Sequence, residues 1–435
     1  MESGDVLLIS TWGSPAHWGV VNYRINGIEK PSCTSLLPML EWLEFKADSV
    51  VIVLDSLVDR PSGGRFVEGT CGECSKEAYE KAGGKVNDYT SLLEEVRGIS
   101  QNILRCLFEK AGLRSEEPRI VVAPAVGRPG GKWEFQGDAR DFIGVVLIEL
   151  GNLVLEKTYR RIVLDLTHGI NFMPAELMYL ARMLASLSLA SHPEVDEITV
   201  EAYNSDPYFR GASSLNLNLV YRETFRGIQF PSSLGRLLTP KGEPPEDVRI
   251  FNDRTGELRR WVRDFLSSLY YPLPLALLEL YDEGEDKVLE GIEDSVKGAY
   301  ELWKKNAEVK GERVNRRVAI DYESVYAFLL ARAISLYLRD KVEVPAGLDI
   351  LKEISEAIYG KVGEIHKVMI VQELSGLQKN PESWERGEGR PNRRVMIAHA
   401  GLQKGLIELE RGREIRIRYK RDARKILKEA GLRLF

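Results

Sequence analysis

An arginine and a histidine stand five residues apart near the C-terminal end of the chain, as Arg394 and His399. Histidine exchanges a proton near neutral pH, and the planar guanidinium of arginine matches the oxygens of a phosphate. The pair therefore predicts phosphodiester chemistry. Asn392 and Arg393, directly before Arg394, are further candidate catalytic residues.

A helix must position these side chains. Proline is favoured at the first helical position, so we expect Pro391 to open the helix and Arg393 and Arg394 to lie in its first turn. At roughly 100° per residue, positions five apart point about 140° away from each other. Either Arg394 lies in a frayed start, or the site is shared between chains; we favour a twofold homodimer that builds one groove from two copies of the helix.

The first half of the chain alternates short apolar runs with longer helical patterns. These runs are apolar throughout, which is typical of a parallel sheet covered on both faces, so the pattern predicts a doubly wound, Rossmann-like α/β domain. Strands are expected at Val6–Ser10, Val50–Asp55, Ile120–Pro124, Ile162–Leu166, Ile198–Tyr203 and Leu215–Tyr221. Helices are expected at Ser35–Phe45, Tyr89–Ala111, Ala139–Glu156 and Pro174–Ala190.

Two turns of this sheet are candidate ligand sites, because ligands of doubly wound sheets bind beyond the carboxyl ends of the strands. Residues 10–19 follow the first strand and residues 165–174 follow the fourth. Glycines there allow close backbone approach, hydroxyls can bond a phosphate, and tryptophan can stack on a base. The candidate ligand-binding residues are Ser10, Thr11, Trp12, Gly13, Trp18, Asp165, Thr167, His168, Gly169 and Asn171.

Taken singly, each of these residues also has a structural interpretation. Trp12 and Trp18 could be core residues, His168 a bonded turn residue and Asn171 a helix cap; together they favour a nucleotide site. Neither turn is a G-x-G-x-x-G fingerprint or a P-loop, which argues against a dehydrogenase or an NTPase.

Both turns and the arginine–histidine pair carry a resemblance. The stretch Asp165-Leu-Thr-His-Gly-Ile-Asn171, after a sheet that opens with Ser10-Thr-Trp-Gly13, resembles the sensor of the CRISPR-associated CARF–HEPN ribonucleases, which are ancillary effectors of type III CRISPR antiviral defence. Arg394-x-x-x-x-His399-Ala-Gly resembles their HEPN motif. The resemblance covers nearly the whole chain. Members commonly carry a polar residue directly after the arginine, whereas this chain has Val395.

This resemblance implies a function. A CARF dimer would bind a cyclic oligoadenylate across its twofold axis, and a HEPN dimer would then cut single-stranded RNA without a metal. The RNA 2′-OH would attack its own phosphorus, with His399 as acid or base and Arg394 stabilising the negative charge. No cofactor is expected, since the cyclic oligoadenylate is an allosteric activator, and DNA, which lacks the 2′-OH, should not be cut.

The second half has a different period. Apolar residues at three- and four-residue steps predict an all-α bundle. Its helices are expected at Gly256–Leu269, Asp286–Glu312, Tyr322–Arg339 and Leu348–Leu377. The Pro-rich stretch from Thr239 divides the chain into a sensing domain, 1–238, a linker, 239–254, and a helical ribonuclease domain, 255–435. Residues 414–420 alternate strictly, so we expect a small hairpin with residues 406–410 whose basic face could track RNA.

Charge is unevenly distributed. The net charge is −5, but residues 376–435 hold sixteen Lys and Arg against eight Asp and Glu, so this segment carries +8 and the rest −13. The basic end is the expected nucleic-acid face, although such a run can also be a solvated surface. The acidic N-terminus and the lack of a long apolar run predict a cytoplasmic protein that does not enter a membrane.

The four cysteines give an incomplete pattern. Cys71 and Cys74 form a C-x-x-C motif in a Gly-rich segment, while Cys33 and Cys106 stand alone. A zinc knuckle, a local disulfide or two free thiols in a surface insertion stay open, and no metal enters the expected mechanism.

Two other functions remain open. The chain could be a ligand-gated transcription regulator whose basic C-terminal hairpin and helix bind duplex DNA, with His399 packed in a dimer core. Alternatively, the first domain could degrade its own cyclic ligand, with His168 or a hydroxyl placed near a phosphate.

Overall fold

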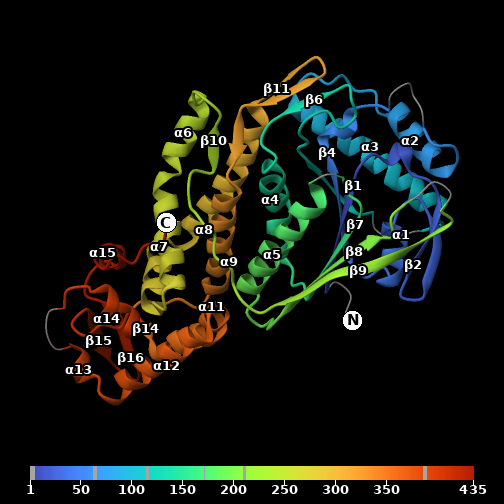
Figure 1. Ribbon diagram of the computed structural model, residues 1–435. Coiled ribbons are helices and arrows are strands. Elements are labelled where there is room, and N and C mark those ends of the chain that lie inside the picture. Colours follow the sequence, from blue (N-terminus) through green and yellow to red (C-terminus); the bar gives the residue numbers. More distant parts are fainter. Residues whose placement is uncertain (1–4, 62–65, 114–116, 171, 209–211, 386–388) are drawn as a thin grey trace.

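An eight-stranded sheet forms the first half of the chain in the computed structural model, which describes residues 5–61, 66–113, 117–170, 172–208, 212–385 and 389–435. The strand order is β3-β2-β9-β8-β7-β1-β4-β5 (Figure 1). The strands are β1 (Val6–Trp12), β2 (Val21–Ile25), β3 (Ile28–Ser32), β4 (Asp48–Leu54), β5 (Arg119–Ala123), β7 (Arg161–His168), β8 (Ile198–Ser205) and β9 (Ser214–Phe225).

Five adjacent strands, β8, β7, β1, β4 and β5, are parallel and reach the β5 edge of the sheet. All six strands expected from the sequence are confirmed. β9 runs antiparallel to β8, and the hairpin β2–β3 extends the edge beyond it. The chain passes from β1 to β4 and β5 on one side, then returns to β7 and β8 on the other. The topological switch point, where such sheets bind ligands, therefore lies between β1 and β7.

Helices cover both faces of this sheet. Right-handed crossovers place α1 (Leu36–Trp42) and α3 (Tyr89–Lys110) on one face, and α4 (Asp141–Glu156) and α5 (Met173–Ser191) on the other (Figure 1). These are the four expected helices. Single turns of 3₁₀-helix follow β1, as η1 (Pro15–His17), and β4, as η2 (Asp55–Val58).

The cysteines correct the sequence interpretation. A helix that the sequence did not predict, α2 (Thr70–Lys81), carries Cys71 and Cys74, and neither forms a local bridge. Cys71 is bonded to Cys33 and Cys74 to Cys106, so Cys33 and Cys106 do not stand alone. The two bridges hold α2 against the end of β3 and against α3.

An all-α bundle had been expected for the second half, but the structure also contains strands there. Its long helices are α7 (Gly256–Tyr270), α8 (Pro274–Lys305) and α9 (Tyr322–Leu338). The expected helix 286–312 is wrong at both ends, because α8 starts earlier and the chain turns into the hairpin β11 (Ala307–Lys310) and β12 (Arg313–Arg316), which extends β6 (Glu134–Gln136). β10 (Leu238–Pro240) pairs with β13 (Val318–Ile320), and α6 is Glu246–Arg254.

The stretch expected as a linker, 239–254, therefore contains part of a strand and a helix, and the division into domains stays a prediction. α8 and α9 pack on α4 and α5 of the first half, so a continuous apolar core joins the halves. None of the helices in the described part of the chain combines the length and the apolar character that crossing a membrane requires.

The C-terminal elements lie at the end of the molecule away from the sheet (Figure 1). The helix expected at 348–377 is broken at Gly363, whose backbone is extended. The elements are α10 (Leu348–Ile354), the π-helical turn η4 (Ser355–Tyr359), α11 (Gly360–Val362), α12 (Glu364–Lys379), α13 (Glu382–Glu385), α14 (Arg393–Ala398) and α15 (Ala423–Glu429). The expected hairpin is present as β15 (Ile407–Arg411) and β16 (Ile415–Tyr419), with β14 (Ala346–Gly347) on its edge.

Candidate sensor pocket and candidate nuclease site

The two candidate turns meet at the switch point. Trp12 at the end of β1 pairs with His168 at the end of β7, and the Gly13 N–H donates to the His168 carbonyl at 2.7 Å. A Cβ on Gly13 would lie 2.6 Å from Ile170, and one on Gly169 would lie 2.4 Å from the Thr11 hydroxyl. Gly13 and Gly169 had been expected to let the backbone approach a ligand closely. In the structure they let the two turns approach each other.

A buried carboxylate organises this junction. Asp165 accepts hydrogen bonds from the hydroxyls of Ser10, at 3.1 Å, and Ser35, at 2.7 Å, and from the Thr167 N–H at 3.1 Å. Burial raises the pKa of Asp165, and these bonds oppose the rise. Ser10 and Asp165 were expected to contact a ligand. They are instead buried, and they bond each other beneath the surface of the two turns.

Thr11 and Trp12 require the same correction. Thr11 is fully buried and its hydroxyl donates to the Asp165 carbonyl at 3.4 Å. Trp12 is 1% exposed and packs edge-on against Trp18, with 5.0 Å between the ring centroids. Both residues are therefore part of the buried junction between the two turns. Asn171 lies outside the described residues.

His168 is held as a neutral imidazole. Its Nε2 accepts the Ser35 N–H at 3.3 Å and lies 3.2 Å from the Tyr23 hydroxyl, so the ring proton belongs on Nδ1. Burial lowers the pKa of His168 to about 3. Trp18 packs on the imidazole at 4.2 Å between centroids.

A cavity of about 190 Å³ opens beside this histidine. It is aromatic and carries no Lys or Arg among the described residues that line it. Its walls are His17, Trp18, Gly19, Val21, Tyr23, Thr167, His168, Ser205, Tyr208 and Leu215. Of the predicted ligand residues it includes Trp18, Thr167 and His168. Tyr23 on β2 and Tyr208 between β8 and β9 lie outside the two candidate turns, and no local pattern marks them.

At the other end of the molecule, α14 carries the arginine–histidine pair. The helix starts at Arg393, with Asn392 as its cap: the Asn392 side chain accepts the Val395 N–H at 3.1 Å. Pro391 therefore lies outside the helix, although Arg393 and Arg394 do lie in its first turn, as expected. A catalytic role had been expected for Asn392, but in the structure its side chain caps the helix.

His399 ends this helix and is 48% exposed. Its Nδ1 lies 3.2 Å from a carboxylate oxygen of Glu373 on α12. Because Nδ1 meets the carboxylate, Nε2 is the nitrogen left for a substrate. Glu373 is the residue that the sequence analysis missed, since a separate helix brings it to the histidine.

The two arginines differ. Arg393 turns to Tyr271, with 3.2 Å from its guanidinium to the tyrosine hydroxyl and 5.8 Å to the ring centroid. Arg394 is exposed and has no ion pair or hydrogen bond among the described residues. Of the two, Arg394 has the guanidinium available for a phosphate.

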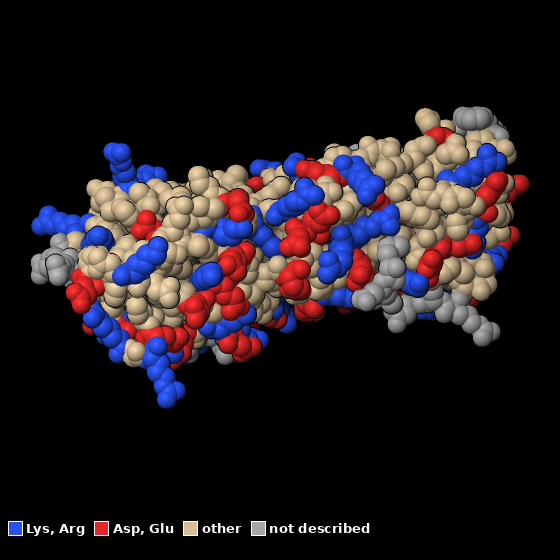
Figure 2. Space-filling view, turned by 90° about the horizontal axis from the view of Figure 1, so that it is seen from below, with Lys and Arg blue, Asp and Glu red and all other residues tan. Residues whose placement is uncertain are grey.

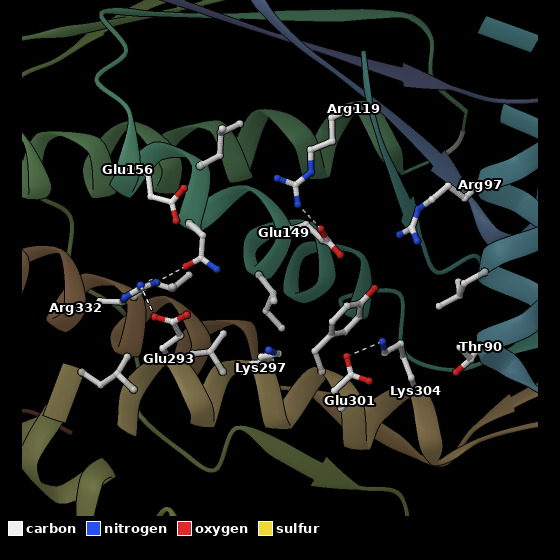
Figure 3. A pocket seen from close by; sticks show the side chains of 18 of the residues that line it. Thr90, Arg97, Arg119, Glu149, Glu156, Glu293, Lys297, Glu301, Lys304 and Arg332 are labelled. Carbon is white, nitrogen blue, oxygen red and sulfur yellow. Dashed lines mark hydrogen bonds and ion pairs between the residues drawn. The ribbon is translucent and has the colours of Figure 1, made fainter. Parts of the chain in front are cut away.

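A larger cleft, about 490 Å³, lies between α3, α4, α8 and α9 (Figure 3). None of the predicted site residues lines it. Its charges balance: Arg97, Arg119, Lys297, Lys304 and Arg332 face Glu94, Glu149, Glu156, Glu293 and Glu301. Several of them are paired with each other, such as Arg119 with Glu149 at 2.7 Å and Arg332 with Glu293 at 2.6 Å. The cleft therefore has no net preference for an anion such as a nucleotide.

A pocket at the switch point of a doubly wound sheet defines the first half as a Rossmann-like ligand-binding domain. Residues 7–207 match the family described as CRISPR system endoribonuclease Csx1, CARF domain. The CRISPR system endoribonuclease Csx1 of Methanocaldococcus jannaschii is 25% identical over 293 residues, which cover 62% of this chain and 54% of that protein. Residues 7–207 therefore form a CARF domain, and the chain is similar to CRISPR-associated endoribonucleases. It spans about half the length of this curated relative.

Proposed function

We propose that this protein is a HEPN-type endoribonuclease that cuts single-stranded RNA by 2′-OH transesterification, without a metal, and is activated by a cyclic oligoadenylate. The observation that carries the proposal is the exposed His399 imidazole, held through Nδ1 by Glu373, on the same short helix as the unpaired guanidinium of Arg394. The Csx1 relative, an endoribonuclease by name, supports the same reaction class.

In this reaction His399 exchanges the proton through Nε2. Glu373 fixes the ring orientation and stabilises the imidazolium form, so that the ring can take the 2′-OH proton or protonate the leaving oxygen. Arg394 stabilises the negative charge that grows on the phosphoryl oxygens. A dimer is part of the proposal, because Arg394 and His399 leave α14 in different directions and a second copy supplies the missing group.

The sensor part of the proposal rests on the pocket beside His168. Its aromatic, uncharged walls suit a nucleobase better than a phosphate, which fits an oligoadenylate that presents its bases. The ligand activates only if it binds one arrangement of the two chains more tightly than the other.

The two alternatives have less support. The basic face of the hairpin, expected to contact nucleic acid, is largely paired: Arg418 meets Glu408 at 2.9 Å, and Arg416 meets Glu414 at 2.9 Å. Self-degradation of the ligand by His168 is disfavoured, because its Nε2 already accepts the Ser35 N–H and has the Tyr23 hydroxyl beside it.

The test is cleavage of a 5′-labelled single-stranded RNA in EDTA, with and without each cyclic oligoadenylate, by the native protein and by His399→Ala. We expect one ring size to raise cleavage, and His399→Ala to lose about 10²–10⁴-fold in rate while it still folds. Normal cleavage by His399→Ala would remove the catalytic assignment, and equal rates with and without every ligand would remove the sensor assignment.

A further inference from the structure

We propose that an arginine patch on α7, formed by Arg259, Arg260 and Arg263 with Arg236 from the loop before β10, binds the phosphate backbone of single-stranded RNA and leads it over Tyr270 to the nuclease site. This inference rests on the proposed function, since it names how that site holds its substrate.

The patch follows from helical spacing. Positions 259, 260 and 263 share one face of α7, because residues three and four apart are neighbours on a helix. Arg236 and Arg260 are exposed, and Arg259 and Arg263 are half-buried. None of the four forms an ion pair within the described part of the chain, and the Nε of Arg263 is buried without a hydrogen-bond partner.

The acidic group nearest in sequence is already engaged. Asp264 follows Arg263 directly, but its carboxylate binds Arg433 at 2.8 Å. Burial, followed by the positive charges of Arg236, Arg263 and Arg260, lowers the pKa of Arg259. Four guanidinium groups that repel one another in this way are stabilised by a polyanion with regularly spaced charges.

An aromatic series connects the patch to the nuclease site. Tyr270, at the end of α7, is 44% exposed and packs edge-on against Phe230 and Tyr271, each with 5.2 Å between ring centroids. Tyr271 in turn contacts Arg393, the first residue of α14. Seven residues separate Arg263 from Tyr270, which is about 10 Å along the helix axis.

The combination identifies the class of ligand. Guanidinium groups that follow a backbone, next to an exposed aromatic ring on which a base can stack, are the features of single-strand nucleic-acid binding. On the face shown in Figure 2, basic and acidic side chains are interleaved along the length of the molecule.

The experiment measures binding separately from cleavage. In the His399→Ala background, fluorescence anisotropy of a labelled single-stranded RNA is followed across a salt series for the parent and for Arg259→Gln/Arg260→Gln/Arg263→Gln. We expect the triple variant to bind on the order of tenfold more weakly at physiological salt, and its slope of log K against log salt to fall by about 2. The control Arg128→Gln/Arg222→Gln/Arg226→Gln removes the same charge from the first half and should leave both quantities unchanged.

Stacking is tested with a matched pair. Tyr270→Ala should weaken binding roughly tenfold, whereas Tyr270→Phe should bind as the parent does, because the ring is kept. Single-stranded DNA of the same length should compete, since contacts to the backbone do not read the 2′-OH.

Three outcomes overturn the proposal: an unchanged affinity and salt slope in the α7 triple variant, an equal loss in the control triple variant, or equal binding by the two Tyr270 variants. Failure of the proposed function is a different result, in which the native protein binds RNA through the arginine patch but does not cut it with any cyclic oligoadenylate.

Discussion

At the scale of single residues, the two histidines that the sequence singles out have opposite environments. His168 is partly buried, and its Nε2 accepts the Ser35 N–H with the Tyr23 hydroxyl beside it, which makes it part of a pocket wall. His399 is half exposed and has one carboxylate partner, Glu373. Only the second environment leaves a nitrogen free to exchange a proton with a substrate.

Glu373→Gln tests whether Glu373 positions His399. The amide keeps the shape but cannot stabilise an imidazolium, so we expect turnover to fall by about tenfold or more with KM for RNA nearly unchanged. Glu364→Gln, an exposed change on the same helix, is the control; equal turnover by the native and Glu373→Gln proteins would exclude the role.

The candidate residues Arg394 and His399 could be identified from the sequence, but the side chains that surround them could not. The pair could be recognised because both residues belong to one short helical segment, so that a local pattern in the sequence marks them. The partners Glu373, Tyr23 and Ser35 come from other elements, and hydrogen bonds between distant segments leave no local pattern. For the same reason Ser10 and Thr11 were expected to face a ligand, although their hydroxyls bond the Asp165 side chain and carbonyl.

At the scale of elements, α5 links the two ends of the molecule. It starts directly after the His168 turn, and its C-terminal end is capped by Lys361 from α11. The Lys361 ammonium donates to the carbonyls of Leu189, His192, Pro193 and Val195, at 2.7–3.3 Å. Leu189 lies in the last turn of α5 and the other three residues follow the helix, so the ammonium holds the helix end together with the loop after it.

Lys361→Met should therefore lower the free energy of unfolding by about 1–3 kcal/mol near pH 8, because buried carbonyls lose their donor. Burial lowers the pKa of Lys361 to about 8 from its usual 10.5. Between these two pKa values, Lys361 is protonated in the unfolded chain but neutral in the native protein. The free energy of unfolding therefore increases as pH rises from about 8 to 10.5.

The difference in free energy of unfolding between the native protein and Lys361→Met should therefore increase across that pH range. Urea unfolding at pH 8 and pH 10 measures it, with the exposed Lys352→Met as control. A deficit that narrows with pH, or matches that of Lys352→Met, would contradict the capping role.

Elements of the sheet were the most predictable part of the fold. Buried parallel strands are continuous apolar runs, so the six expected strands and four expected helices are present. The sequence failed where tertiary contacts decide: α2 is held by two disulfides, β11 and β12 extend a strand of the other half, and Gly363 breaks a long apolar pattern.

At the scale of the whole molecule, the halves are tied by groups that the sequence does not mark as partners. Arg316 on β12 is fully buried and bonds Asp55, at the end of β4, at 2.9 Å. A buried charge that loses its partner is costly, so this contact fixes how the helical half sits on the sheet. A ligand at the switch point, on the same edge as Asp55, therefore acts on a firmly joined molecule, and the proposed activation must come from rearrangement between two copies.

The central claim is that each nuclease groove draws on two chains, and mixing two inactive variants tests it most directly. Arg394→Ala and His399→Ala proteins, each nearly inactive alone, are mixed under conditions that exchange subunits and assayed on single-stranded RNA with activator. We expect the mixture to recover activity far above either parent, because a mixed dimer still holds one intact arginine and one intact histidine in the shared groove. Activity no higher than that of the separate variants, with subunit exchange verified, would contradict the account.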